Sequence, residues 1–252
     1  MKFELVSSFC GLIPFMQVII LAGGLGTRLA EETDLIPKPM VRIGPHPIIR
    51  HIMNHFAEFG HFKFIVAAGY KADVIEEYFL NEILPINWEV SVVDTGLDTA
   101  TGGRLLRLKD LQEDRFFLTY GDGLSNIDLN SLLTFHLRTG KLATVTAVRP
   151  PARFGTVEIA NGVVTKFSEK DPQDVGWING GFFVIEKEFI RYIQGDETVL
   201  EREPLQQIAS NQQLSGYEHK EWWQPMDTLR DKRELEKLWE GGNPPWAVKH
   251  ND

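Results

Sequence analysis

Cysteine, basic charge and uninterrupted hydrophobic stretches are all scarce in this chain. Its 252 residues contain one cysteine, Cys10, which excludes a disulfide framework or a thiolate metal cluster and indicates a reducing compartment. The 26 basic residues are outnumbered by 35 acidic ones, and the net charge of -9 argues against a general nucleic-acid-binding protein. We therefore expect a cytoplasmic protein that binds no nucleic acid. If its substrate is anionic, its few cations must gather at the site.

One stretch without charge, residues 5–23, has the composition of a signal peptide or a membrane span. Ser7, Ser8 and Pro14 interrupt its apolar character, and cleavage near Ala22 would destroy the glycine-rich loop that begins there. We therefore expect no association with a membrane. Residues 1–15 are predicted to be an N-terminal extension, followed by a single domain over residues 16–252.

Short apolar runs alternate with helical patterns along most of the chain. This alternation predicts an α/β fold with a mainly parallel central sheet and helices on both faces. Ligands on such sheets bind beyond the carboxyl ends of the strands. Strands are predicted at 16–22, 62–68, 88–94, 115–120, 142–148 and 178–185, and helices at 47–59, 71–81, 128–139, 186–193, 203–210 and 229–240.

After residue 150 the pattern becomes more antiparallel. Asn161-Gly162 lies between β-branched runs, which predicts a hairpin over residues 156–167 with a primed turn. The strand at 178–185 carries a glycine pair, which indicates that a ligand or another backbone approaches closely. No linker separates the two halves, so we expect one domain.

The stretch Met16–Arg28, MQVIILAGGLGTR, predicts a buried strand that ends in a glycine-rich loop. Glycines let backbone N–H groups approach phosphate oxygens closely. The loop is not a Walker A motif, since Thr27-Arg28 follow Gly26, and it is not a dinucleotide fingerprint, since Leu29 replaces the third glycine. The alternative is an ordinary turn between a strand and a helix. The nearby cations Arg28 and Lys38 favour a polyphosphate site.

A second glycine-rich stretch, Thr95–Arg104, TGLDTATGGR, allows two interpretations. Its glycines and hydroxyl groups could close over a base or ribose, or Thr101 could cap a helix that begins there. The local sequence does not separate these alternatives.

Two aspartates are candidates for a metal site. Asp122 lies between glycines at the end of the strand 115–120, and Asp227 follows the stretch WWQPM. Each has an alternative structural role, an Asx turn for Asp122 and a helix cap for Asp227. Trp222 and Trp223 are interpreted as core residues. Together with the glycine-rich loop and Lys38, the aspartates suit phosphoryl chemistry by positioning and charge neutralisation, with Mg²⁺ bound by carboxylates and substrate phosphates.

The chain resembles the sugar-1-phosphate nucleotidyltransferases from residue 16 to about residue 246. The resemblance rests on LAGGLGTR, PKPM, TGGRL, TYGDG, RFG, INGGFFV and WWQPMDTLRDK. Within this family TGGRL and the last two motifs point to the glucose-1-phosphate cytidylyltransferases. The resemblance implies a Rossmann-like, three-layer α/β/α fold of the nucleotide-diphospho-sugar transferase type. It also implies a homo-oligomer that transfers CMP from CTP to α-D-glucose 1-phosphate by direct in-line attack with Mg²⁺, giving CDP-glucose and pyrophosphate for bacterial surface polysaccharides such as O-antigen.

The resemblance also implies roles for individual residues. Those expected at the nucleotide are Leu21, Ala22, Gly23, Gly24, Gly26, Thr27, Arg28, Lys38, Thr99, Arg104 and Gly121. Those expected at glucose 1-phosphate are Glu169, Lys170, Asn179 and Gly180. The catalytic residues would be Arg28, Lys38 and Asp122, and the Mg²⁺ ligands would be Asp122 and Asp227.

The chain departs from the family pattern between Tyr78 and Trp88, where a long insertion is shortened. It also departs at Asp171, where the family has proline. Two alternatives stay open. One is a thymidylyl-, uridylyl- or guanylyltransferase acting on another sugar 1-phosphate, and the other is a non-catalytic homologue that senses nucleotide sugars.

Overall fold

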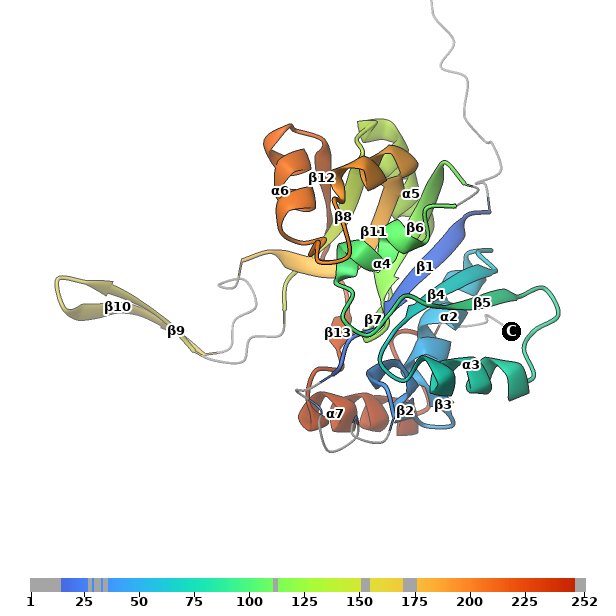
Figure 1. Cartoon of the computed structure of the whole chain (residues 1–252). Coiled ribbons are helices and arrows are strands. Elements are labelled where there is room, and N and C mark those ends of the chain that lie inside the picture. The colour runs from blue at the N-terminus through green and yellow to red at the C-terminus, as the bar shows by residue number, and fades with distance from the viewer. Residues whose placement is uncertain are drawn as a thin grey trace, which may run out of the picture.

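A computed structural model describes residues 15–26, 29, 33, 36–110, 113–150, 155–169 and 176–247. Its centre is a seven-stranded sheet in the order β12-β8-β11-β6-β1-β4-β5 (Figure 1). Strand β11 is antiparallel to both of its neighbours, and the other neighbouring pairs are parallel. The predicted mainly parallel sheet is therefore confirmed. The strands are β1 (Gln17–Ala22), β4 (Lys63–Ala68), β5 (Glu89–Asp94), β6 (Arg115–Tyr120), β8 (Ala143–Val148), β11 (Ile178–Glu186) and β12 (Leu214–His219).

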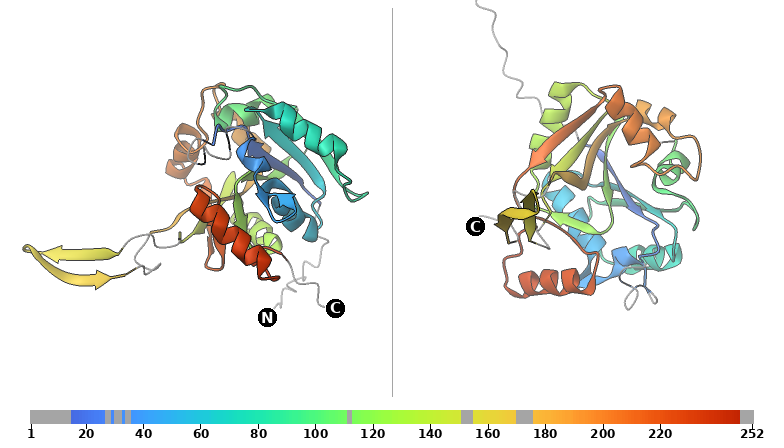
Figure 2. Two further views of the ribbon diagram at one scale, coloured as in Figure 1. Left: turned by 90° about the horizontal axis from the view of Figure 1, so that it is seen from below. Right: turned by 90° about the vertical axis from the view of Figure 1, so that its left-hand side faces the viewer.

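Strand β1 explains why the sheet has helices on both faces (Figure 2). Every residue of β1 is buried between β4 and β6, so it has apolar side chains on both sides. Val18 and Ile20 belong to one hydrophobic cluster, and Ile19 and Leu21 to the other. The first cluster is covered by α2 (Ile48–Glu58), α3 (Ala72–Asn81), α5 (Leu129–Thr139) and α7 (Leu229–Glu240), and the second by α4 (Thr101–Arg107), η4 (Lys187–Tyr192) and α6 (Glu203–Ser210). This is the three-layer arrangement that was predicted.

Several elements of the fold were not predicted, or were predicted as a different type. The edge strand β12 contains Gly216 and is only partly buried, so it lacks a strong strand pattern. The segment predicted as a helix at 186–193 is the 3₁₀ helix η4. Two-stranded pairs also form, β2 (Arg42–Ile43) with β3 (His46–Pro47) and β7 (Gly123–Ser125) with β13 (Trp223–Pro225), and η2 spans Lys38–Met40. The helices of the described part of the chain include none long and apolar enough to span a membrane.

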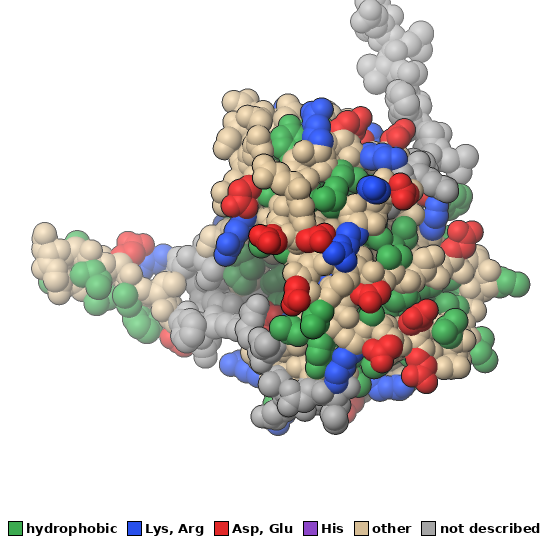
Figure 3. Space-filling view, viewed as in Figure 1, with side chains coloured by type: hydrophobic (Ala, Val, Ile, Leu, Met, Phe, Trp, Pro, Cys, Tyr) green, Lys and Arg blue, Asp and Glu red, His purple; other side chains and the backbone are tan. Residues whose placement is uncertain are grey.

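The predicted hairpin is confirmed as β9 (Thr156–Ala160) and β10 (Val163–Ser168). Asn161 and Gly162 at its turn have φ values of 51° and 80°, as a primed turn requires. The hairpin projects from the body of the molecule (Figures 1 and 2), and hydrophobic side chains are exposed along it (Figure 3). These exposed side chains are Val157, Ile159, Val163, Val164 and Phe167.

Candidate active site

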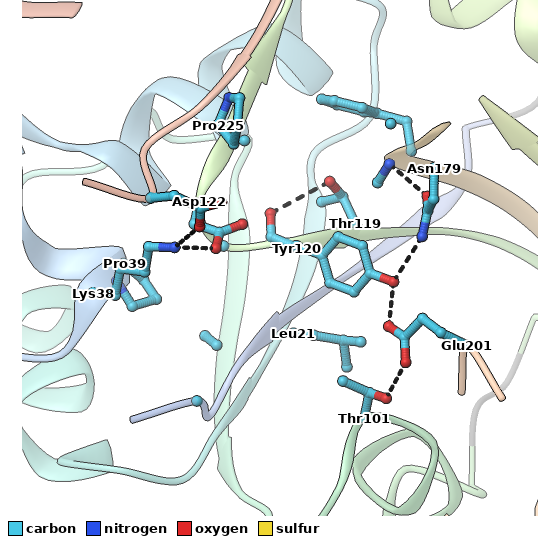
Figure 4. Close-up of a pocket in the computed structure, with 18 of the residues that line it drawn as sticks. Leu21, Lys38, Pro39, Thr101, Thr119, Tyr120, Asp122, Asn179, Glu201 and Pro225 are labelled. Atoms are coloured by element: carbon cyan, nitrogen blue, oxygen red, sulfur yellow. Dashed lines mark hydrogen bonds and ion pairs between the residues drawn. The ribbon is translucent and has the colours of Figure 1, made fainter. Parts of the chain in front are cut away.

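A cavity of about 550 Å³ opens at the carboxyl ends of β1 and β6 (Figure 4). Because β11 is antiparallel to β6, its first residues reach the same edge of the sheet and form another wall. The lining residues are Leu21, Ala22, Gly24, Gly26, Lys38, Pro39, Thr101, Thr119, Tyr120, Gly121, Asp122, Gly123, Ile178, Asn179, Gly180, Gly181, Phe182, Glu201, Trp223, Pro225 and Asp227. The cavity lies where ligands of such sheets are expected.

A charged group of three residues lies in this cavity. The Lys38 ammonium contacts Asp122 Oδ2 at 2.6 Å and Asp227 Oδ1 at 2.7 Å. Burial alone would lower the pKa of Lys38, but the two carboxylates raise it above its usual value, so the side chain is charged. The three residues are far apart in sequence, and the fold brings them together.

The fold positions each member of this group. Lys38 begins η2, with a proline on either side of it. Strand β7, which follows Asp122, pairs with β13, and the amide of Met226 donates to the carbonyl of Asp122 at 2.8 Å. Helix α7 is capped by Thr228 and Asp231, not by Asp227. The alternative role of Asp227 as the helix cap is therefore wrong, and its carboxylate faces Lys38.

The two aspartates fit a magnesium ion. Both carboxylates contact one nitrogen atom, so they lie close enough to share a small cation. The described residues include no group of three or more His, Cys, Asp or Glu side chains able to hold a metal. Two carboxylates suffice for Mg²⁺, which takes its other ligands from water and substrate phosphates.

The glycine-rich loop forms the wall on the β1 side. Apart from its chain neighbours, no atom of the described residues would lie within 4 Å of a Cβ atom at Gly24, so the described part of the fold does not require glycine there. Gly26 has a φ of 65°, which favours glycine. Gly121 packs against Pro39, and its amide donates to the carbonyl of Leu21 at 3.0 Å. Thr27 and Arg28 lie outside the described residues.

Gly23, Thr99 and Arg104 lie behind this wall and do not line the cavity. The Arg104 guanidinium is buried, which lowers its pKa, and it donates to the carbonyls of Gly23 at 3.0 Å and Ala68 at 2.9 Å. It also donates to Thr95, Gly96 and Leu97. Arg104 therefore supports the glycine-rich loop from behind.

On the β11 side, Asn179 and Gly180 line the cavity. Glu169 lies near Gly155 at the base of the hairpin and does not line the cavity. Lys170 lies outside the described residues. Trp223 packs against the hydrophobic core as predicted, but it also lines the cavity, and its indole N–H donates to the carbonyl of Gly180 at 2.7 Å. An aromatic pair gives no sequence signal that separates these roles.

A hydrogen-bonded cluster on the far side of Tyr120 from Lys38 was not predicted, apart from Asn179 (Figure 4). Asn179 Nδ2 donates to the Tyr120 hydroxyl at 3.2 Å, and this hydroxyl donates to Glu201. Thr101 Oγ1 donates to the other oxygen of Glu201 at 2.7 Å. Helix α4 begins at Thr101, so the alternative of a helix that starts here is confirmed, but the N-cap residue is Ala100 and the predicted capping role of Thr101 is wrong.

Comparison with known proteins agrees with this geometry. The family model described as "Nucleotidyl transferase" matches residues 17–228. The glucose-1-phosphate cytidylyltransferase of Salmonella typhimurium is 46% identical over 255 residues, which is 92% of this chain and 99% of that protein. The mannose-1-phosphate guanyltransferase of Gibberella zeae is 30% identical over 227 residues, 85% of this chain and 62% of that protein. The crystal structure of HddC from Yersinia pseudotuberculosis superposes with a TM-score of 0.70 at 24% identity, covering 89% of this chain and 99% of that one. The chain belongs to the nucleotidyl transferase family.

Proposed function

We propose that the protein is a Mg²⁺-dependent glucose-1-phosphate cytidylyltransferase, which transfers CMP from CTP to α-D-glucose 1-phosphate and releases pyrophosphate. The observation that carries this proposal is the convergence of Lys38, Asp122 and Asp227 in a cavity walled by the glycine-rich loop. The choice of CTP and glucose 1-phosphate is supported by the 46% identity to the Salmonella typhimurium enzyme of that name.

The residues of the cavity suit direct in-line attack. A phosphate oxygen of glucose 1-phosphate forms a bond to the α-phosphorus of CTP, and the bond from that phosphorus to the bridging oxygen of pyrophosphate breaks. The attacking phosphate is already ionised at neutral pH, so no general base is required. The described lining residues accordingly include no histidine or cysteine. Lys38 neutralises negative charge at the α-phosphate during attack.

The remaining roles form part of the same proposal. Asp122 and Asp227 would hold Mg²⁺, which supplies further charge neutralisation when it is bound. The backbone of Leu21, Ala22, Gly24 and Gly26 would contact the nucleotide, with Thr27 and Arg28 at the triphosphate. Lys170, Asn179 and Gly180 would contact glucose 1-phosphate, whereas Glu169, which does not line the cavity, has no role in this proposal.

Initial rates of pyrophosphate release test the proposal. Glucose 1-phosphate and Mg²⁺ would be supplied with CTP, UTP, dTTP or GTP in turn. We expect kcat/KM for CTP to exceed the others by about 10-fold or more. A preference for another nucleotide would contradict the cytidylyl assignment. Binding of a nucleotide sugar without turnover of any of the four would instead support the sensing alternative.

We also propose that the protein is a cytoplasmic homo-oligomer with a single domain over residues 16–252. Exposed apolar side chains along β9 and β10 support self-association, because an isolated two-stranded hairpin is marginally stable in water. Light scattering coupled to gel filtration should give a mass that is a multiple of the chain mass. A monomer at micromolar concentration would contradict this proposal.

A further inference from the structure

The cavity carries a carboxylate for which neither the sequence motifs nor the comparisons provide a role. This is Glu201, which lies two residues before the start of α6 and joins Thr101, Tyr120 and Asn179 in the hydrogen-bonded cluster (Figure 4). We propose that Glu201 accepts a hydrogen bond from a hydroxyl group of the sugar 1-phosphate and selects sugars without a further negative charge. The inference rests on the proposed function and specifies how its second substrate is recognised.

The direction of the hydrogen bonds leaves Glu201 as an acceptor. Asn179 donates to Tyr120, Tyr120 donates to one oxygen of Glu201, and Thr101 donates to the other. A carboxylate has about four acceptor positions, so the two internal donors leave capacity for a ligand. Burial and the adjacent Glu201 raise the pKa of Tyr120, so its proton stays on the phenol. Asn179 Nδ2 has a second N–H that can donate to a ligand. The Tyr120 hydroxyl thus connects a hydrogen-bond acceptor, Glu201, to a donor, Asn179, and two neighbouring sugar hydroxyls suit this pair.

Packing against helix α4 holds Glu201 in place. The amides of Ala100 and Gly102 donate to the carbonyls of Asp196 and Thr198 at 2.8 and 2.9 Å. The amide of Leu200 donates to Thr101 Oγ1 at 2.9 Å, next to the carboxylate itself. An acceptor held by its own backbone loses little conformational freedom when a ligand binds. The position of Glu201 is therefore set before the sugar arrives.

The order of the strands in the sheet supports placing the sugar at the end of the cavity that holds Glu201 and Asn179. The glycine-rich loop follows β1, whereas Asn179 is the second residue of β11, on the other side of β6. The two substrates must meet near Lys38, and the nucleotide occupies the wall with open space over Gly24. The sugar then takes the wall formed by β11 and the Glu201 cluster. A second anionic group there would face the carboxylate, and like charges in a partly enclosed cavity repel each other.

The variant Glu201→Gln tests the inference because it preserves size and removes the charge. With CTP saturating, we expect KM for glucose 1-phosphate to rise about 10-fold, whereas KM for CTP should change less than about 2-fold. The preference for glucose 1-phosphate over glucuronic acid 1-phosphate should fall in the same variant. Glu201→Asp should recover part of the loss. The matched control is Glu203→Gln on the exposed first turn of α6, which should behave as wild type.

A second variant keeps the inference testable if Glu201→Gln fails to fold. Tyr120→Phe keeps the ring and removes the hydroxyl that donates to Glu201, so we expect a smaller rise in KM for glucose 1-phosphate, about 3-fold. An unchanged KM for glucose 1-phosphate in these variants, or an increase confined to KM for CTP, would overturn the inference. Turnover of CTP and glucose 1-phosphate by the wild-type protein would still support the proposed function. Wild-type protein inactive on every sugar 1-phosphate would overturn both.

Discussion

Two glycine-rich segments look alike in the sequence but differ in what surrounds them. Gly24 in the first segment faces the cavity, and beyond its chain neighbours an added Cβ atom would meet none of the described residues within 4 Å. Gly103 in the second segment lies under a loop, and its Cβ atom would be 2.3 Å from the carbonyl oxygen of Asp196. Glycine leaves space for a ligand in the first case and for the chain itself in the second.

The difference shows why glycine pairs alone do not identify a binding loop. The glycines of the second segment affect the site only indirectly, because they let the loop that carries Glu201 pack on α4. Arg104 connects the two segments, since it belongs to the second and donates to the carbonyl of Gly23 in the first. Replacing Gly24 in the first segment should therefore affect ligand binding, and replacing Gly103 in the second should affect stability.

The largest effect is expected beside the first segment, at the charged group. Asp122→Asn removes one of the two carboxylates that would share Mg²⁺, so turnover should fall about 10³-fold or more. The fold should persist, because the backbone carbonyl of Asp122 still accepts from Met226. Initial rates and circular dichroism would measure these outcomes, with exposed Asp73→Asn as control. Near-normal activity in Asp122→Asn would refute the metal role.

Gly103→Ala should act mainly through stability. Its Cβ atom would collide with the backbone of Asp196, which cannot rotate away as a side chain would. We expect the free energy of unfolding to fall by about 1–3 kcal/mol. Urea denaturation followed by fluorescence would measure the change. If Gly103→Ala were as stable as wild type, the second segment would have room for a side chain. The contrast between the two glycine-rich segments would then be wrong.

Gly24→Ala is the matched variant in the first segment. Because the added methyl group meets no neighbouring side chain or backbone in the part of the chain that the structure describes, the free energy of unfolding should change by less than about 0.5 kcal/mol. The methyl group would occupy space open to the nucleotide, so KM for CTP should rise about 3-fold or more. Denaturation and initial rates on one preparation would show both effects. If Gly24→Ala were less stable than wild type but had a normal KM for CTP, glycine would be needed here for packing and not for the nucleotide.

A separate effect, which needs no substitution, is expected at the opposite end of β1, where pH should act on stability. His61 Nδ1 accepts from the amide of Met16 at 3.1 Å, and burial lowers the pKa of His61 from 6.5 to about 4. The unfolded chain therefore takes up a proton first as the pH falls. This stability is present above pH 6.5 and declines toward pH 4.

His51 and His55 are buried with similarly lowered pKa values. Each histidine should contribute a loss on the order of 1–2 kcal/mol at pH 5 relative to pH 7. Urea denaturation at both pH values would measure this loss. Equal free energies of unfolding at the two pH values would contradict the conclusion that these histidines are neutral in the folded protein. The stability difference between Gly103→Ala and wild type should stay constant across this range, because that substitution changes no titrating group.

Local chemistry made much of the molecule predictable. Strand β1 and the hairpin turn at Asn161-Gly162 follow from side-chain periodicity and from residues that tolerate positive φ, both readable over a few positions. Local patterns also identified Lys38, Asp122 and Asp227 as candidates but left each with a structural alternative.

The sequence by itself thus determined the α/β fold class, most of its strands and helices, and a glycine-rich loop near a few isolated cations and carboxylates. Only the tertiary structure decided that Lys38 contacts both aspartates, that Arg104 supports the loop from behind, and that Glu201 lies in the cavity. The reason is physical. Each of these contacts joins residues far apart along the chain, and their distances depend on how the sheet and its helices pack.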